Sequence, residues 1–593
     1  MCGIVGYIGK DIEKIIISKL KKLEYRGYDS AGIAVGNADG YKVFKAKGEI
    51  KNLEKIIEIT PQADIGIGHT RWATHGKPDE INAHPHISTN KQWALVHNGI
   101  IENYAEIKEK LIAQGMTFYS QTDSETIAKL LEYYEFKDGL ESIFKTISAL
   151  DGSYALAVLH NQERKIFFAK NKSPLYVALK NGEALLASDV ICFGGFAEEY
   201  YVIEDGEFGF TDGKDLVIRN DFGKVCKTAV KLAADFSTEE NVYDHFMIKE
   251  IYDTKNALLS NLEYYSVENN YKKLYDTDIS YFDKVVLVGC GTAYHACLSG
   301  ARFFREKINV DCFTEVASEF RYSHPKINEK TIVFLVSQSG ETADTLAAYD
   351  LAHKAGAKTV AIVNVEYSTL AKSADVSMPI KAGVEVAVAS TKAYSAQVLT
   401  LYIAAMIFDA KKKGNKVCLD NINDLVRTFE YGNIALYKEI AETLRYQQKI
   451  FMIGRGADYC SANEASLKIK ETSYINSDTY YAGELKHGFL ALIDDMTYVV
   501  VFATEKDVLS KTLSNAEEAY SRGAKLILFT CFDDIDKEFK DKCFFIVKIR
   551  NTGCGLQAIE NIVPWQLIAY YTSVSKGINP DKPRNLAKSV TVE

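Results

Sequence analysis

The residue with the clearest chemical potential in this sequence is Cys2, near the start of the chain. If Met1 is removed, Cys2 carries both a nucleophilic sulfur and the chain's free α-amine. An α-amine titrates at about pH 8, so it can accept the thiol proton near neutral pH, which a lysine amine cannot do. A structural interpretation is also available, because the three glycines and three aliphatic residues that follow suit a buried first strand. The stretch alone leaves both interpretations open.

A polar, histidine-rich run follows between positions 69 and 97, and it holds five of the eleven histidines. A metal centre is the alternative for such a cluster, but no thiol or carboxylate joins it at ligand spacing. We therefore expect no metal site here. Most of these histidines are interpreted as hydrogen-bonded core or loop residues.

Three other polar features of this half could bind a small substrate. Arg71 supplies a permanently charged fork that grips an α-carboxylate. Asp123 could bind an α-ammonium, although a helix N-cap explains it equally well. Asn98 and the Gly99 amide could form an oxyanion hole, and a hairpin turn is the structural alternative for this pair.

The second half has the pattern of a parallel α/β sheet. The apolar strand 331–336, a polar loop, the helix 343–354 and the strand 359–363 form a βαβ unit. The loop places hydroxyl and amide groups at a helix start, where the dipole favours an anion; these residues are Ser337, Gln338, Ser339 and Thr342. No lysine lies nearby, so the loop predicts a single phosphate held by neutral donors. An earlier strand, 284–288, leads to Thr292 but lacks the third glycine of a dinucleotide fingerprint, because Tyr294 stands there.

A related pattern recurs about 165 residues later, with strands at 449–453, 498–502 and 525–529. Its loop 503–506 lacks the serines, so only the first copy should bind phosphate and the duplicated pair should make one site. In the second copy, Glu464, Lys468 and Glu471 share one helical face, as either a catalytic set or a surface ion-pair ladder. His487 stands in a glycine-flanked loop, and Lys588 lies five residues from the C-terminus.

Bulk properties limit the class of protein. A chain of 593 residues suggests three or four domain-sized units, and a net charge of −9 disfavours nucleic acid as a partner. The eleven cysteines are scattered without paired spacing, and no secretory segment is recognisable, so we expect reduced thiols in a cytoplasmic protein. No apolar run approaches the roughly 18 to 20 residues of a membrane span, and no membrane partner is expected.

The first 230 or so residues resemble the class II glutamine amidotransferase domain. The resemblance is carried in order by CGIVGYIG, YRGYDSAG, HTRWATHG, NAHPH, HNGIIENY and TDSE. It implies an N-terminal-nucleophile hydrolase fold of two stacked sheets between helical layers. It also implies that Cys2 attacks the amide of L-glutamine, that Arg71 and Asp123 hold the substrate's backbone charges, and that Asn98 and Gly99 stabilise the oxyanion. Thr74 and His75 would line the covering loop. Trp72 would gate ammonia, although simple packing also explains a tryptophan there.

The remainder resembles sugar isomerase (SIS) domains, and the whole chain resembles the glutamine–fructose-6-phosphate aminotransferase family. SQSGETADT, ASTKAY, LKIKE, GELKHG and PRNLAKSVTVE carry this resemblance. It implies amino-sugar synthesis without a cofactor or metal, from glutamine and D-fructose 6-phosphate, in a homodimer or larger homo-oligomer. The sugar-binding residues would be Thr292, Ser337, Gln338, Ser339, Thr342, Val388, Ser390 and Ala587. His487 would help to open the sugar ring, Lys588 would form a Schiff base, Glu471 would move a proton and Lys468 would neutralise charge.

The expected architecture is an α/β multidomain chain. The amidotransferase domain is expected at 2–228, a linker at 229–241, a first SIS domain at 242–430 and a second at 431–593 with a catalytic tail. Four residues depart from the family's usual pattern, namely Ala293, Val384, Ala387 and Phe489. None of them removes a titrating group, so they affect affinity more than reaction type. Two alternatives stay open: another class II amidotransferase, which makes a phosphoribosylamine or an asparagine, and a non-enzymatic sugar-phosphate sensor.

Overall fold

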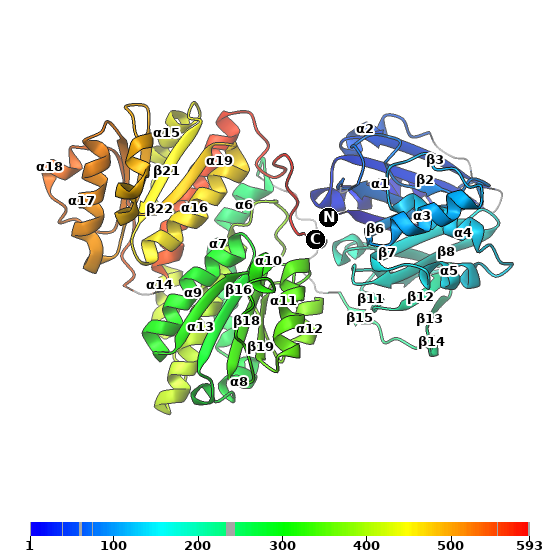
Figure 1. Ribbon diagram of the computed structural model, residues 1–593, viewed down its shortest axis with the longest axis horizontal. Helices are drawn as coiled ribbons and strands as arrows, with labels where there is room; N and C mark the ends of the chain where they lie inside the picture. Colours follow the sequence, from blue (N-terminus) through cyan, green and yellow to red (C-terminus); the bar gives the residue numbers. More distant parts are fainter. Residues whose placement is uncertain are drawn as a thin grey trace. The chain divides into compact units, whose positions relative to one another are not determined.

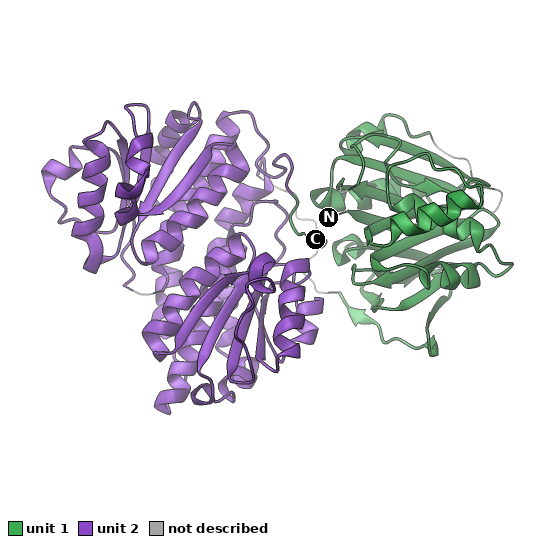
Figure 2. Cartoon of the chain, viewed as in Figure 1, with its two compact units in different colours: residues 1–240, 587–592 green, residues 241–586, 593 purple. Residues whose placement is uncertain are grey.

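The chain divides into two compact units. The computed structural model describes residues 2–37, 40–58, 62–73, 75–232, 243–553 and 555–590. The first unit comprises residues 1–240 with the short segment 587–592, and the second comprises residues 241–586 (Figure 2). Thr74 and residues 233–241 of the expected linker lie outside the described residues.

The first unit contains two antiparallel sheets (Figure 1). The eight-stranded sheet has the order β15-β11-β9-β10-β1-β4-β2-β3, with β1 (Gly3–Ile8), β2 (Ser30–Asn37), β3 (Gly40–Lys47), β4 (Ile65–Arg71), β9 (Tyr176–Lys180), β10 (Glu183–Ala187), β11 (Glu199–Val202) and β15 (Val230–Lys231). The seven-stranded sheet has the order β14-β13-β12-β8-β7-β6-β5, with β5 (His86–Ile87), β6 (Trp93–Ile101), β7 (Gly152–His160), β8 (Glu163–Asn171), β12 (Glu207–Thr211), β13 (Leu216–Asn220) and β14 (Gly223–Val225).

Helices cover the outer face of each sheet. They are α1 (Ile12–Leu23) and α2 (Ile50–Glu54) on the first sheet, and α3 (Tyr104–Ala113), α4 (Ser124–Tyr133) and α5 (Gly139–Ile147) on the second. In β1, Ile4 and Ile8 pack between the two sheets, whereas Val5 and Tyr7 pack under the helices. Successive side chains of a strand point to opposite faces, so a fully apolar β1 is buried on both sides. The result is a four-layer arrangement of helix, sheet, sheet and helix.

The second unit contains two five-stranded parallel sheets. The first has the order β17-β16-β18-β19-β20, with β16 (Lys284–Gly289), β17 (Asp311–Val316), β18 (Thr331–Ser337), β19 (Lys358–Val363) and β20 (Val376–Pro379). The second has the order β22-β21-β23-β24-β25, with β21 (Lys449–Gly454), β22 (Asn476–Tyr481), β23 (Tyr498–Ala503), β24 (Lys525–Thr530) and β25 (Cys543–Lys548). Continuous apolar runs form these strands because helices bury both faces of a parallel sheet.

One apolar core joins the two sheets of this unit. Helices α9 (Thr292–Ile308) and α16 (Ala457–Ser473) follow β16 and β21 and pack against each other. The other helices are α6 (Phe246–Tyr252), α7 (Thr254–Tyr265), α8 (Glu268–Tyr275), α10 (Ala317–Phe320), α11 (Ala343–Lys354), α12 (Thr369–Ser373), α13 (Lys392–Lys413), α14 (Asp420–Arg427), α15 (Ile434–Leu444), α17 (Leu509–Tyr520), α18 (Lys537–Lys540) and α19 (Gln557–Ser575). This packing brings a helix from one copy of the repeat to the loops of the other.

Helix α13 corrects one expectation from the sequence. By length and composition it is the one helix within the described ranges that could cross a membrane, although no apolar run of that length was expected. Most of its apolar window, 89%, is buried in the second unit, where its residues belong to the shared core. Its composition is that of a helix surrounded by protein on all sides. The two parallel sheets of the second unit and the two antiparallel sheets of the first otherwise confirm the predicted fold class.

Two candidate active sites

The thiol of Cys2 lies where two neighbouring strands meet. β1 pairs antiparallel with β4, so the start of β1 lies beside the end of β4, where Trp72 follows. The Trp72 N–H donates to Cys2 Sγ at 3.2 Å, and the Trp72 carbonyl lies 3.5 Å from the same sulfur. Burial raises the pKa of the Cys2 thiol above its usual value, while the positive amino terminus and the Trp72 N–H oppose this shift. The raised pKa favours the protonated form of the thiol.

Asn98 and Gly99 lie in the middle of β6, so the hairpin-turn interpretation was wrong. Asn98 Nδ2 donates to the Cys2 carbonyl at 3.0 Å, which places this amide beside Cys2. Gly99 has φ +129, and a Cβ built on it would lie 2.0 Å from the Ser153 carbonyl oxygen. Only glycine fits there, because the backbone conformation is unfavourable for other residues and the neighbouring strand is too close.

His69 fixes the orientation of the Asn98 side chain, a role that the sequence did not reveal. Its Nε2 lies 3.1 Å from Asn98 Oδ1 and 3.0 Å from the His97 carbonyl. Both partners accept hydrogen bonds, so we assign the proton to Nε2. Burial lowers the pKa of His69 to about 3, and Arg71 adds to this effect, so the ring is neutral. The Asn98 carbonyl therefore faces His69 and its NH₂ group faces Cys2.

The charged residues Arg71 and Asp123 are both buried, and both influence the Cys2 thiol. The Arg71 guanidinium donates to the carbonyls of His75 and Lys77. Asp123 stands at the N-cap position of α4 but makes no capping bond with its side chain. Its Oδ2 instead accepts from the Ile101 N–H at 2.9 Å. The carboxylate is thus positioned by β6 instead of capping its own helix.

The histidine-rich run forms part of this interior. The imidazole rings of His69 and His84 stack at 4.1 Å, and His97 Nδ1 lies 2.9 Å from Ser124 Oγ. His75 is half-buried, and its ring meets Tyr104 edge-on at 5.4 Å. Trp72 is also half-buried and meets Tyr28 edge-on at 6.1 Å. The expected hydrogen-bonded roles of these histidines agree with these contacts.

In the second unit, the predicted phosphate loop lies between β18 and α11. Ser337 ends the strand and Thr342 occupies the N-cap position of the helix, and their hydroxyls are 2.9 Å apart. The Gly340 N–H donates to Ser337 Oγ and the Glu341 N–H donates to Ser339 Oγ, at 3.0 and 3.2 Å. Hydroxyls and N–H groups therefore converge at the start of a helix, a favourable place for an anion.

Glu464 and Lys468 of α16 are buried and Glu471 is half-buried, so the surface-ladder interpretation was wrong. Lys468 is fully buried, and its Nζ lies 2.6 Å from Glu471 Oε2 and 3.3 Å from Glu464 Oε1. Burial alone would lower the pKa of Lys468, but the two carboxylates raise it above its ordinary value. The side chain is a fixed cation at the centre of the site.

Helix α9 of the first copy supplies the partners of this set. Lys468 Nζ donates to Thr292 Oγ1 at 3.0 Å, and Thr292 donates to Glu464 at 3.1 Å. His295, one helical turn beyond Thr292, lies 2.8 Å from Glu464 Oε2. The sequence did not single out His295, although its spacing from Thr292 places both on one helical face. The second unit thus builds one site from both copies of the repeat.

Two buried glutamates that the sequence analysis missed hold the loop 384–391. Glu385 accepts from Ser390 Oγ at 2.8 Å and from two backbone N–H groups, and Glu250 accepts from the N–H groups of Val386 and Ala387. The Val388 N–H donates to the Asp581 carbonyl at 3.1 Å. Their only sequence signal was an acidic residue inside an apolar stretch.

The remaining predicted residues lie in other segments of the chain. His487 ends a short 3-10 helix, Ala482–His487, that follows the edge strand β22, and it is exposed. Ala587 and Lys588 belong to the C-terminal segment that groups with the first unit. Their roles stay predictions.

Comparison with known proteins covers both units. The SIS domain family matches residues 279–407 and 443–576, and the glutamine amidotransferase domain family matches residues 69–194. The chain is 41% identical over 611 residues to the glutamine–fructose-6-phosphate aminotransferase (isomerizing) of Caldanaerobacter subterraneus subsp. tengcongensis, and 41% identical over 610 residues to that of Staphylococcus aureus. Both alignments cover all of both chains. Among solved structures, the C-terminal domain of glucosamine-fructose-6-phosphate aminotransferase from Francisella tularensis is 31% identical with a TM-score of 0.51, covering 58% of this chain and 100% of that one.

Proposed function

This chain belongs to the glutamine–fructose-6-phosphate aminotransferase (isomerizing) family, and from that premise we propose how its two units divide the reaction. The enzyme transfers the amide nitrogen of glutamine to D-fructose 6-phosphate and yields D-glucosamine 6-phosphate and glutamate. The observation that carries this conclusion is the full-length similarity to enzymes of that name. It favours this family over another class II amidotransferase or a sugar-phosphate sensor.

In the first unit, we propose that Cys2 is the nucleophile. Removal of Met1 would free an α-amine that takes the thiol proton, and the sulfur would then bond to the amide carbon of glutamine. The oxyanion would be stabilised by the Asn98 side chain, aimed by His69, and by the Gly99 N–H. The C–N bond then breaks, the nitrogen leaves as ammonia, and water hydrolyses the thioester to glutamate.

Arg71 and Asp123 would hold the glutamine α-carboxylate and α-ammonium. A guanidinium has five N–H donors, so the contacts of Arg71 with two loop carbonyls leave donors for a carboxylate. Asp123 is a buried carboxylate beside the same thiol, which supports its pairing with a cation. His75, Trp72 and Thr74 would complete the covering loop.

In the second unit, we propose that the loop of Ser337, Gln338, Ser339 and Thr342 binds the phosphate, with Thr292, Val388 and Ser390 around the sugar. Ala587 would adjoin them, and His487 would open the ring, reaching in from a second copy of the chain. Lys588 would form an imine with the C2 ketone and release water, and ammonia would then displace the lysine. Glu471 would take a proton from C1 and deliver one to C2, which turns the ketose imine into the aldose amine. Lys468 stabilises the negative charge that develops.

Several wider features are proposed on the same basis. A second subunit follows from the proposed role of His487. Ammonia released into water would be protonated, so a closed internal route from one reaction to the other is required. The cysteines within the described residues are free thiols, which supports a cytoplasmic location. We also propose the division into domains at 2–228, 242–430 and 431–593 that the sequence predicts.

The test is to incubate the chain with glutamine and fructose 6-phosphate and to measure glucosamine 6-phosphate. Cys2→Ala should abolish glutamine-dependent synthesis but leave synthesis from high ammonium. Lys588→Ala should impair sugar conversion more than glutaminase activity. Normal glutamine-dependent synthesis by Cys2→Ala would refute the scheme, as would an intact mass showing that the active enzyme retains Met1.

A further inference from the structure

The two copies of the repeat in the second unit match residue by residue at their first strand and helix. β16 and α9 become β21 and α16 when 165 is added to each residue number. The glycine before each helix has nearly the same conformation, with φ 53 and ψ −125 at Gly291 and φ 59 and ψ −126 at Gly456. Each helix also ends on a residue in the left-handed region, Asn309 or Tyr474. The positions that build the sugar site therefore have counterparts elsewhere in the unit.

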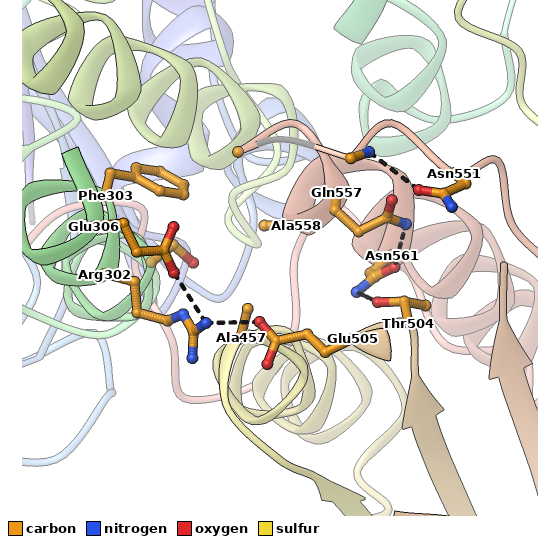
Figure 3. A pocket seen from close by; sticks show the side chains of 13 residues that line it. Arg302, Phe303, Glu306, Ala457, Thr504, Glu505, Asn551, Gln557, Ala558 and Asn561 are labelled. Atoms are coloured by element: carbon orange, nitrogen blue, oxygen red, sulfur yellow. Dashed lines mark hydrogen bonds and ion pairs between the residues drawn. The ribbon is translucent and has the colours of Figure 1, made fainter. Parts of the chain in front are cut away.

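Those counterparts surround a real pocket of about 200 Å³ (Figure 3). The sugar site combines α16 of the second copy with loops of the first, and this pocket combines α9 of the first copy with loops of the second. On the helix, Phe303 and Glu306 correspond to Lys468 and Glu471. After the strands, Thr504 and Glu505 correspond to Gln338 and Ser339. The alignment follows from the strand pairing, because Ile332 of β18 and Tyr498 of β23 pair with equivalent positions of β16 and β21.

The chain itself fills the place where this pocket could have held a phosphate. The Glu505 carboxylate accepts from the Ala457 N–H at the start of α16, and a Cβ on Gly456 would lie only 2.0 Å from it. Arg302 pairs with this carboxylate at 2.7 Å. A helix start attracts an anion, and here a side chain supplies that anion together with its cation. A phosphate in the same place would meet a like charge.

The rest of the pocket is suited to a sugar ring without phosphate. Figure 3 shows Phe303 on one wall and the side chains of Asn551, Gln557 and Asn561 on the other. Aromatic faces and a few amide groups are typical of sites for small polar ligands. An engineered cavity of about 150 Å³ holds a benzene ring, so this pocket has room for one six-membered ring.

The charge at the pocket favours a cation. Glu306 and Glu505 share the single guanidinium of Arg302, at 3.0 and 2.7 Å, which leaves one net negative charge. Glu306 is 60% exposed at its side chain and is free to meet a ligand amine. We propose that this pocket is a second, non-catalytic binding site for a hydroxyl-rich molecule with an amino group and no phosphate, of which a free amino sugar is the simplest.

The test is calorimetric titration of the full-length enzyme with glucosamine, first without and then with saturating fructose 6-phosphate. We expect one glucosamine per chain and at least fivefold weaker binding of glucose, which has a hydroxyl in place of the amine. Glu306→Gln should weaken glucosamine binding at least tenfold and leave amino-sugar synthesis intact. Its counterpart variant, Glu471→Gln, should impair amino-sugar synthesis and leave glucosamine binding intact, which separates the two sites.

Three results would overturn the proposal. Displacement of glucosamine by fructose 6-phosphate would assign the binding to the isomerase site. Equal affinity of Glu306→Gln and the unchanged enzyme would place the ligand elsewhere. Absence of saturable binding would show that the pocket takes no such ligand. None of these results bears on the synthesis reaction, which the Cys2 and Lys588 variants test separately.

Discussion

Replacement of His69 by phenylalanine tests whether this histidine orients the Asn98 side chain in the proposed oxyanion hole. Phenylalanine keeps a ring that can stack on His84, but it removes the N–H that Asn98 Oδ1 accepts at 3.1 Å. In the native enzyme, a flipped Asn98 side chain would point its NH₂ group at the His69 N–H and its carbonyl oxygen at the Cys2 carbonyl oxygen. Neither pair could form a hydrogen bond. The variant loses the first of these two constraints.

The magnitude follows from the value of one hydrogen bond. A buried hydrogen bond between neutral groups contributes about 1 to 1.5 kcal/mol, so the preference for the productive amide orientation falls about tenfold. Complete loss of one oxyanion donor costs about a hundredfold to a thousandfold in kcat. We therefore expect His69→Phe to lower the glutaminase kcat by up to about tenfold, which is less than the complete loss of that donor would cost.

The assay is steady-state glutamine hydrolysis, with KM and kcat determined separately. KM for glutamine should stay within about twofold, because Arg71 and Asp123 keep their contacts, and synthesis from ammonium should be unchanged. His69→Gln, which restores an N–H donor, should recover part of kcat. A folded His69→Phe enzyme with normal kcat, or with a raised KM in place of a lowered kcat, would refute the reasoning.

Other perturbations test the interior of each unit. Lys468→Met leaves two carboxylates without their cation and should cost about 3 to 5 kcal/mol of unfolding free energy, measured by urea denaturation, with the exposed Lys486→Met as control. Gly99→Ala brings a Cβ within 2.0 Å of the Ser153 carbonyl, so glutaminase activity and thermal stability should fall together. Acid should destabilise the first unit below about pH 6.5, because burial lowers the pKa of its four buried histidines. Below this pH the unfolded chain binds protons that the folded unit does not. Each histidine then lowers the free energy of unfolding by up to about 1.4 kcal/mol per pH unit, and thermal melts at several pH values measure this loss. These histidines are His69, His84, His86 and His97.

The parallel sheets were predictable because each strand is apolar along its whole length. The expected strands 284–288 and 331–336 became β16 and β18 with one residue added to each. A strand buried on both faces can be recognised from its apolar composition alone. The polar loop after β18 could be located because the strand before it and the helix after it are both recognisable in the sequence. The repeat was visible for the same reason.

The pairings between distant strands and helices were not predictable from local patterns. Asn98 and Gly99 have the local signature of a turn, but their position is fixed by the antiparallel partner strand β7. The spacing of Glu464, Lys468 and Glu471 shows that they share a face of α16, yet it does not show that α9 covers this face. Periodicity tells which side chains lie together, and only the tertiary structure tells what lies against them.

The buried position of Lys468 bears on the proposal that Lys588 forms the imine. An amine must be neutral to attack a ketone, and Lys468 is held as a cation because Glu464 and Glu471 raise its pKa. We therefore expect Lys468 to stabilise charge and not to act as the nucleophile, which supports the proposal that Lys588 forms the imine. Borohydride reduction in the presence of fructose 6-phosphate should attach the sugar to Lys588, and peptide mass analysis should find Lys468 unmodified. A reduced adduct on Lys468 would show that the ion pairs open during the reaction and would reverse the two assignments.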